Sequence, residues 1–318
     1  MIVRFWGTRG SLPVALTVPE VKRKLVAALT KAAGRSLDTP AKAQAFIDTE
    51  LDFAVSHTFG GNSSCVEIET GGTDYVLCDL GSGARTFGNH VLATRGPSGN
   101  TFHVLMSHVH WDHIMGFPFF MPAYIPGNRV RIYGCHAVLE EAFRRQNATP
   151  SFPVDFSRMG AAIEFVRLEP GRDYEIGGLA VCAKLQRHGG DSYGYRLAKD
   201  DKVVVYSTDS EHKLEDPAET QAFVEFFADA DLVIFDAQYS LADAVSVKED
   251  WGHSSNIVGV ELAQRARVKH LCMFHHEPMF DDDKIAAVLR ETRRLEEITH
   301  AGHRVEISAA WDGLEITV

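Results

Sequence analysis

The chain has 318 residues, of which 45% are hydrophobic and 24% are charged, as in a folded globular protein with ample core. Its net charge of −11 argues against broad, non-specific nucleic-acid binding, although bound divalent ions would mask part of that charge. We find no apolar run of membrane-spanning length, no signal-peptide pattern and no paired spacing among the five cysteines, so we expect a cytoplasmic protein with free thiols and no membrane partner.

Apolar periodicity and turn residues predict the elements in chain order. The expected strands cover residues 3–6, 63–69, 74–80, 102–106, 129–134, 162–168, 178–186, 193–198, 202–207, 231–235 and 270–274. The expected helices cover residues 19–33, 136–146, 254–266 and 282–299, with one more beginning at Thr39-Pro40 and another ending near Ala228. A final hairpin over residues 304–318 is expected to turn at Asp312-Gly313.

This order of elements predicts one α/β domain over residues 1–318, with two layers of sheet and helices outside. The first two helices lie within about residues 16–52 and interrupt strand regions, so we expect a helical insertion that serves as a lid or as a subunit contact. The aromatic stretch at residues 117–124 favours core packing or the face of a homodimer over stacking of a base.

The most informative stretch follows the expected strand 102–106 and reads Ser107-His108-Val109-His110-Trp111-Asp112-His113. It concentrates three imidazoles and a carboxylate, which need partners when buried and which bind divalent ions through nitrogen and oxygen. His108 and His110 point to the same side of an extended segment, whereas Asp112 and His113 lie past the strand end and face a second position. The pattern predicts one strand end that serves two adjacent metals.

Other polar residues end other apolar runs, and ligands of α/β folds gather at the carboxyl ends of strands. The residues at these ends are His188, Asp209, Asp236 and His275. We expect one metal to bind His108, His110 and His188 and the second to bind Asp112, His113 and His275, with Asp209 bridging both. Two such metals lower the pKa of a water or hydroxide between them, which indicates hydrolysis. His276 is an alternative to His275.

These residues resemble the metallo-β-lactamase superfamily. The likeness runs from Asp79 and its following glycines, through the His-x-His-x-Asp-His cluster, to His188, Asp209 and His275. It implies an αββα sandwich of two mixed sheets flanked by helices. Two further segments, Phe235-Asp236-Ala237 and Gly252-His253-Ser254-Ser255, look like those of the ribonuclease Z and cyclic-phosphodiesterase branch, with Asp in place of the ribonuclease Z Glu. By this resemblance Asp236 orients His253, which protonates the leaving oxygen or holds the phosphate.

The chain lacks the long glycine- and basic-rich arm with which ribonuclease Z grips transfer RNA. The resemblance therefore implies a dinuclear-metal phosphodiesterase that hydrolyses small phosphodiesters, cyclic nucleotides among them, by a metal-bridging hydroxide, with Asp112, His253 and Asp236 as catalytic residues. The alternatives are a ribonuclease Z-like endoribonuclease, a lactonase- or thioesterase-type hydrolase, and a metal-loaded binding or sensing protein. Zinc suits nitrogen-rich open sites, with manganese or iron as alternatives. Arg9 and residues 60–64 line an anion site or form a turn.

Overall fold

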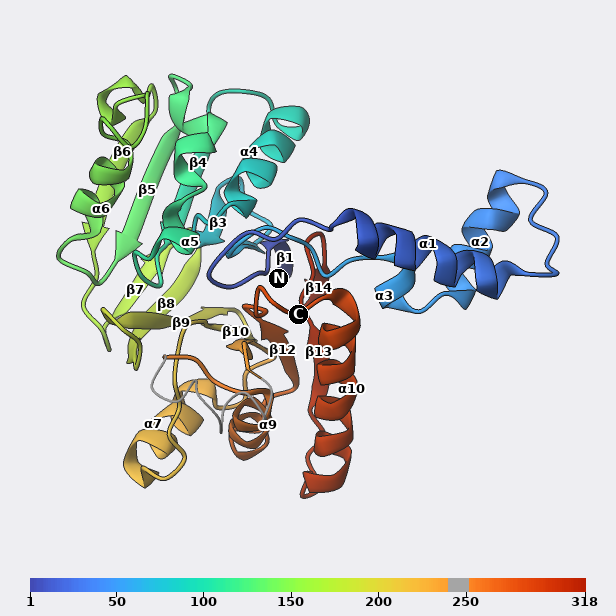
Figure 1. Ribbon diagram of the computed structural model, residues 1–318. Helices are drawn as coiled ribbons and strands as arrows, with labels where there is room; N and C mark the ends of the chain where they lie inside the picture. Colours follow the sequence, from blue (N-terminus) through green and yellow to red (C-terminus); the bar gives the residue numbers. More distant parts are fainter. Residues whose placement is uncertain (240–251) are drawn as a thin grey trace.

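The computed structural model describes residues 1–239 and 252–318. Two seven-stranded sheets face each other, and helices cover their outer faces (Figure 1). The predicted fold class, an αββα sandwich of two mixed sheets, is confirmed.

The first sheet joins both ends of the chain to its first half. Its strands in spatial order are β14 (Glu315–Thr317), β1 (Ile2–Gly7), β2 (Cys65–Glu69), β3 (Tyr75–Cys78), β4 (Thr101–Leu105), β5 (Arg129–Gly134) and β6 (Ala162–Arg167). The strands from β3 to β6 are parallel, so their carboxyl ends meet at one edge. The helices α4 (Gly83–Thr94) and α6 (Leu139–Gln146) pack on its outer face.

The second sheet repeats this arrangement. Its strands in spatial order are β13 (Glu306–Ala309), β12 (His270–Phe274), β11 (Leu232–Asp236), β10 (Lys202–Ser207), β9 (Ser192–Lys199), β8 (Leu179–Gln186) and β7 (Asp173–Ile176). The strands from β10 to β13 are parallel. Its outer face is covered by α7 (Pro217–Phe227), α9 (Asn256–Arg265) and α10 (Asp282–Thr299).

The inner faces of both sheets form the central core. Its largest side chains include Phe5 from the first sheet and Tyr195, Tyr206 and Phe274 from the second, all fully buried. Burial of this much apolar surface holds the sheets face to face. The carboxyl ends of the parallel strands of the two sheets come together at one edge of the sandwich, and this edge carries the polar strand-end residues of the sequence.

Helices fall within residues 16–52 as expected, at α1 (Val18–Ala32) and α2 (Pro40–Glu50), and α3 (Phe53–Ser56) follows. Figure 1 shows α1 and α2 projecting away from the sheets. No residue of α1 is buried, and its base is tied to the start of α10 by Lys24–Asp282 at 2.6 Å and Arg23–Asp281 at 3.1 Å. A role as a lid or a subunit contact stays a prediction.

The predicted terminal hairpin is wrong. The turn at Asp312-Gly313 exists, but β13 pairs with β12 in the second sheet and β14 pairs with β1 in the first. The Asp312 carboxylate accepts backbone hydrogen bonds from Gly61 (3.0 Å) and Asn62 (2.9 Å), which fixes the turn as a crossing between sheets. The elements that were not predicted include α4 and β7; in α4 glycine interrupts the apolar spacing, and Gly88 lets the helix approach Phe120.

Three smaller expectations can be compared with the structure. Four cysteines are buried and Cys182 is half-buried, and none forms a disulfide within the described ranges. In the aromatic stretch, Phe117 and Phe120 are core residues as predicted, whereas Phe119 is 54% exposed. Across residues 1–239 and 252–318, every helix is too short or too polar to cross a bilayer.

Candidate metal centre

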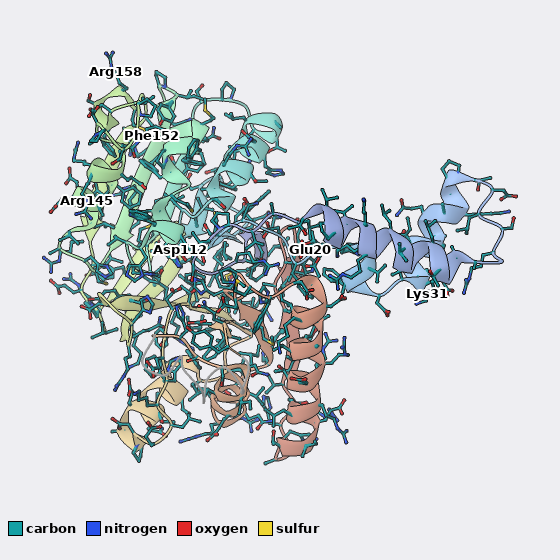
Figure 2. All side chains as sticks on the ribbon, in the orientation of Figure 1. Glu20, Lys31, Asp112, Arg145, Phe152 and Arg158 are labelled. Carbon is teal, nitrogen blue, oxygen red and sulfur yellow. The ribbon has the colours of Figure 1, made fainter. Side chains whose placement is uncertain are left out.

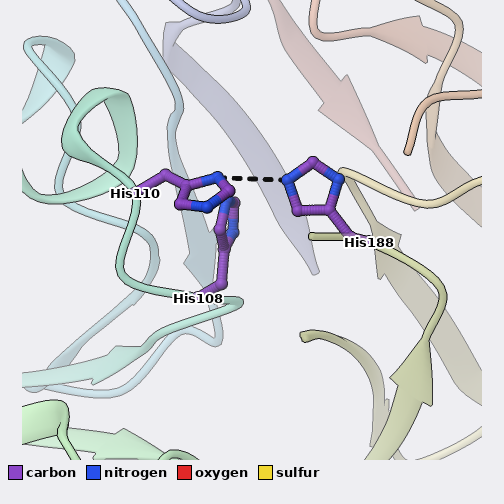
Figure 3. A group of neighbouring side chains, drawn as sticks. All are labelled: His108, His110 and His188. Atoms are coloured by element: carbon purple, nitrogen blue, oxygen red, sulfur yellow. Dashed lines mark hydrogen bonds between the residues drawn. The ribbon is translucent and has the colours of Figure 1, made fainter. Parts of the chain in front are cut away.

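The predicted ligands converge from four strand ends into two adjacent groups. We call His108, His110 and His188 the outer set, and Asp112, His113, Asp209 and His275 the inner set. Within each set the nitrogen and oxygen atoms that could bind a metal all lie within 4.8 Å of one another. The outer set is drawn in Figure 3, where the His110 and His188 rings approach each other above His108.

Asp209 stands between the two sets. Its Oδ1 lies 3.2 Å from His113 Nε2 and 3.3 Å from His275 Nε2, both in the inner set. Its Oδ2 lies 3.7 Å from the Nε2 atoms of both His108 and His188, in the outer set. One carboxylate therefore presents one oxygen to each set, which is the arrangement a bridging ligand needs.

Every residue of the inner set is buried, and hydrogen bonds at Nδ1 orient its two histidines. Asp79 Oδ2 accepts a hydrogen bond from His113 Nδ1 at 2.8 Å, and Gln238 Oε1 accepts one from His275 Nδ1 at 3.2 Å. These contacts leave the Nε2 atom of each ring facing Asp112 Oδ2, at 3.1 and 3.3 Å respectively. Nε2 is therefore the atom that each ring would offer to a metal.

The outer set is more open. His110 is exposed and His188 half-buried, and their Nδ1 and Nε2 atoms are 3.1 Å apart (Figure 3). His188 Nδ1 donates to the Gly252 carbonyl at 2.8 Å. Gly252 has φ +81°, and a Cβ there would lie 2.5 Å from His188 Nδ1, so glycine is required for this approach. Behind them His108 Nε2 is buried with no hydrogen-bond partner among the described residues.

The electrostatics of the centre fit divalent cations. Burial, together with the neighbouring His113, holds the pKa of His108 well below its usual value, so this ring is neutral. Burial opposes ionisation of Asp209, but the adjacent His275 and His113 hold its pKa well below the usual range. Among residues 1–239 and 252–318 the ion-pair partners of Asp112 and Asp209 are all histidines. Buried carboxylates and orphaned imidazole nitrogens are the donor chemistry of a metal-binding cluster.

Two open choices from the sequence are resolved by position. His276 Nε2 donates to the Ala310 carbonyl at 2.8 Å, so it is His275 that lies in the inner set. The guanidinium of Arg9 is buried and donates to the carbonyls of Gly60 (2.9 Å) and Phe280 (2.8 Å). This side chain therefore stabilises the turn at residues 60–64.

His253 adjoins both sets, and its partner is Asp236. His253 Nδ1 lies 2.8 Å from Asp236 Oδ2, and the ring stacks on His275 at 5.2 Å and meets His188 edge-on at 5.1 Å between centroids. Burial alone would lower the pKa of His253, but the Asp236 carboxylate outweighs it and raises that pKa to about 9. The ring is therefore protonated at neutral pH.

A comparison with protein families gives this geometry its context. The family model described as "Beta-lactamase superfamily domain" matches residues 76–276, which include every residue of both sets. The chain belongs to the beta-lactamase superfamily. Membership confirms the predicted family and the predicted enzyme class, a metal-dependent hydrolase.

Individual members of the superfamily are distant relatives of this chain. A ribonuclease Z from Listeria welshimeri is 22% identical over 250 residues, which cover 64% of this chain and 79% of that protein. The metallo-beta-lactamase fold protein YhfI from Bacillus subtilis superposes with a TM-score of 0.65 at 17% identity, over 99% of this chain and 98% of its own. The short form of human tRNase Z gives 0.60 at 18% identity, over 100% and 99%. These two structures share the fold.

Two residues that orient the ligating histidines, Asp79 and Gln238, are not identified by the sequence patterns alone. Asp79 stands out there only as part of the family resemblance, yet its carboxylate accepts hydrogen bonds from His113, Tyr206 and the backbone and hydroxyl of Ser107. Gln238 does not stand out at all. Both follow strands, β3 and β11, so the strand-end criterion that identifies the predicted ligands also applies to them.

Proposed function

We propose that this chain is a dinuclear-metal phosphodiesterase that hydrolyses small phosphodiesters. The position of Asp209 carries the proposal, because its two oxygens face two separate ligand sets. The outer set would hold one ion, the rest of the inner set the second, and Asp209 both. Zinc is the metal that suits this nitrogen-rich donor set, and manganese or iron would fit the inner carboxylates.

The ions, when bound, supply the Lewis acidity that activates water and offsets charge on the phosphoryl oxygens. The chain supplies the proton transfers. Burial opposes ionisation of Asp112, but His113 and His275 hold its pKa far below the usual range, so this carboxylate stays ionised and is available to bind the inner ion and orient the attacking water. Asp236 holds His253 by Nδ1, which leaves the protonated Nε2 to donate to the departing oxygen.

A second candidate is endoribonuclease activity, since a relative of this chain is named ribonuclease Z. The net charge of −11 and the absence of a basic arm in the sequence speak against a polyanionic substrate that must be gripped over many phosphates. Small phosphodiesters need no such surface. We therefore place them first.

The test is hydrolysis and metal content of the purified protein. Metal-loaded protein should contain close to two divalent ions per chain and hydrolyse bis(p-nitrophenyl) phosphate and a cyclic nucleotide. Asp209→Ala should abolish both properties. Asp201→Ala is the matched control, because Asp201 is an exposed aspartate at the opposite end of β10.

Three results would contradict the proposal. Full activity without metal would remove its basis. Hydrolysis of lactones or thioesters with no phosphodiester turnover would assign the centre to carboxylic substrates. Cleavage of a transfer-RNA precursor, with binding that falls steeply as salt rises, would favour the endoribonuclease.

A further inference from the structure

A groove partly lined by aromatic side chains lies against the segment that carries the ligands His110 and Asp112, on the side of the first sheet. Its walls are the segment from Val109 through α5 (Trp111–Ile114), the turn η1 (Phe117–Phe119), the end of α6, and the loop after α6 that carries Phe152. The groove has a volume of about 510 Å³, within the range of small-molecule sites. From the segment that carries the ligands, only the side chains of Val109, Trp111 and Ile114 line the groove, and none of these three belongs to either ligand set.

Trp111 connects the groove to the centre through the backbone. It stands between His110 of the outer set and Asp112 of the inner set, yet its own side chain is 80% exposed. Across the groove Phe119 is 54% exposed and meets Phe152 edge-to-face, with ring centroids 5.5 Å apart. Single exposed apolar residues are ordinary, but aromatic rings gathered in a hollow beside a reactive centre indicate a binding site.

The charge at the groove favours an anionic ligand. Arg145, which lines the groove from α6, has no ion-pair partner among the described residues, whereas its neighbour Arg144 pairs with Glu140 at 2.7 Å. Figure 2 shows Arg145 and Phe152 on the α6 side of the molecule, away from the α1–α2 projection. In a chain with a net charge of −11, an unpaired guanidinium here attracts a negatively charged group to this place.

We propose that this groove binds the aromatic ring of the ester group that remains on phosphorus, so that the preferred substrates are phosphodiesters carrying a nucleobase on that side. The inference rests on the phosphodiesterase function proposed above. His253 packs against His275 at the end of the second sheet and serves the departing oxygen, while Trp111 lies at the end of the first sheet. In a phosphodiester with two separate ester groups, the departing group would then lie toward the second sheet and the retained group toward Trp111. Stacking on an indole accepts any base, so the groove selects for a base without specifying which.

A pair of substrates with one leaving group isolates this contact. Thymidine 5′-(p-nitrophenyl) phosphate and methyl p-nitrophenyl phosphate release the same phenolate and differ only in the retained group. The wild-type protein should prefer the thymidine ester by about tenfold in kcat/KM, the scale of one base–aromatic stack. Trp111→Ala should bring the ratio of the two kcat/KM values close to one, and Trp111→Phe should restore most of it. Ile298→Ala, which removes a 66% exposed side chain from α10, is the matched control.

A binding measurement gives a readout that needs no turnover. By calorimetry, the metal-loaded protein should bind adenosine 5′-monophosphate about tenfold more tightly than ribose 5-phosphate, and Trp111→Ala should bind both equally. Because the Trp111 side chain is mostly in water, its removal should leave the unfolding midpoint unchanged, which separates a lost contact from a lost fold.

The outcomes distinguish the two proposals. Hydrolysis of both esters with no preference, or a preference that survives Trp111→Ala, overturns the groove proposal and leaves the phosphodiesterase standing. Failure to hydrolyse either ester overturns the phosphodiesterase, and with it the groove as a substrate site. Conversion of a dimer to a monomer by Trp111→Ala, with the preference retained, shows that the aromatic face joins two copies of the chain and also overturns the groove proposal.

Discussion

The two ligand sets of this centre differ in how firmly the fold holds them. Every residue of the inner set is buried, and its histidines are held by Asp79 and Gln238, which follow strands of the two different sheets. In the outer set His110 is exposed, and His188 relies on the carbonyl of Gly252. Hydrogen-bond partners behind a ligating histidine raise its affinity for metal because they fix the orientation of the ring.

From this contrast we infer that the inner and outer metal positions have different functions. A buried site whose two histidines are already held by hydrogen bonds is formed as soon as the sandwich closes, so the inner ion should bind tightly and stabilise the fold. A site with an exposed histidine should bind its ion more weakly, exchange it more readily and be the one that meets substrate. Substitutions of the ligands, and of the residues that hydrogen-bond to them, can therefore test whether the inner position binds its ion more tightly than the outer position.

Removing one histidine from each set should have unequal consequences. His113→Ala should lower kcat/KM roughly a thousandfold and leave the protein with little tightly bound metal, since this ring serves the inner position. His110→Ala should lose the outer ion while keeping about one ion per chain. Metal analysis after dialysis, combined with turnover of bis(p-nitrophenyl) phosphate, measures both. Equal metal loss in the two variants would contradict the ranking.

Replacing His253 should separate chemistry from metal binding. Its ring packs against one histidine of each set, and its own Nδ1 is held by Asp236. His253→Asn should therefore lower kcat roughly 10²- to 10³-fold, the contribution of a positioned general acid, with metal content unchanged. Loss of bound metal in this variant would show that His253 is a ligand. His300→Asn, at the end of α10, is the control for histidine content.

The sequence alone indicates this centre well because the signal is topological. Carboxyl ends of parallel strands share an edge, so the strand-end positions of His188, Asp209 and His275 suffice to join them to the cluster at residues 108–113, and the fold brings them together. The same reasoning does not reveal which groups accept a hydrogen bond from each ligating histidine. The Gly252 carbonyl and the Gln238 amide reach their histidines through tertiary packing, which leaves no periodic trace in the sequence.

The errors in the predicted fold have the same origin. The Asp312-Gly313 turn is recognisable from local chemistry, but local chemistry does not specify which neighbour each flanking strand pairs with, and the two strands belong to different sheets. The aromatic groove is also invisible in the sequence, because Phe119 and Phe152 lie more than thirty residues apart and only the fold brings their rings together. Exposure of Trp111 is likewise a property of the packed molecule.

Removing the hydrogen bond between Asp79 and His113 should have an intermediate effect on metal affinity. Asp79→Asn keeps the shape of the side chain but puts an amide against His113 Nδ1, which needs an acceptor. Affinity for the inner ion should fall about 10- to 100-fold, as is typical when a ligating histidine loses its hydrogen-bond partner. Competition with a chelating dye measures this affinity. Asp74→Asn, a half-exposed carboxylate near His103 on the same sheet, is the matched control. An unchanged inner affinity would show that burial alone orients the ring.

The mildest change tests the outer set through one methyl group. Gly252→Ala introduces a Cβ 2.5 Å from His188 Nδ1 at a residue with φ +81°, so the backbone cost of about 1 kcal/mol comes with displacement of the ring. Gly34→Ala is the matched control, because Gly34 has φ +78° and nothing within 4 Å of the added carbon. Both variants should lose similar unfolding free energy, but only Gly252→Ala should weaken outer-ion affinity, by about tenfold, and leave the inner ion in place. Equal metal affinities in the two variants would mean that the Gly252 carbonyl does not hold His188, and the outer set would then owe its geometry to the ion itself.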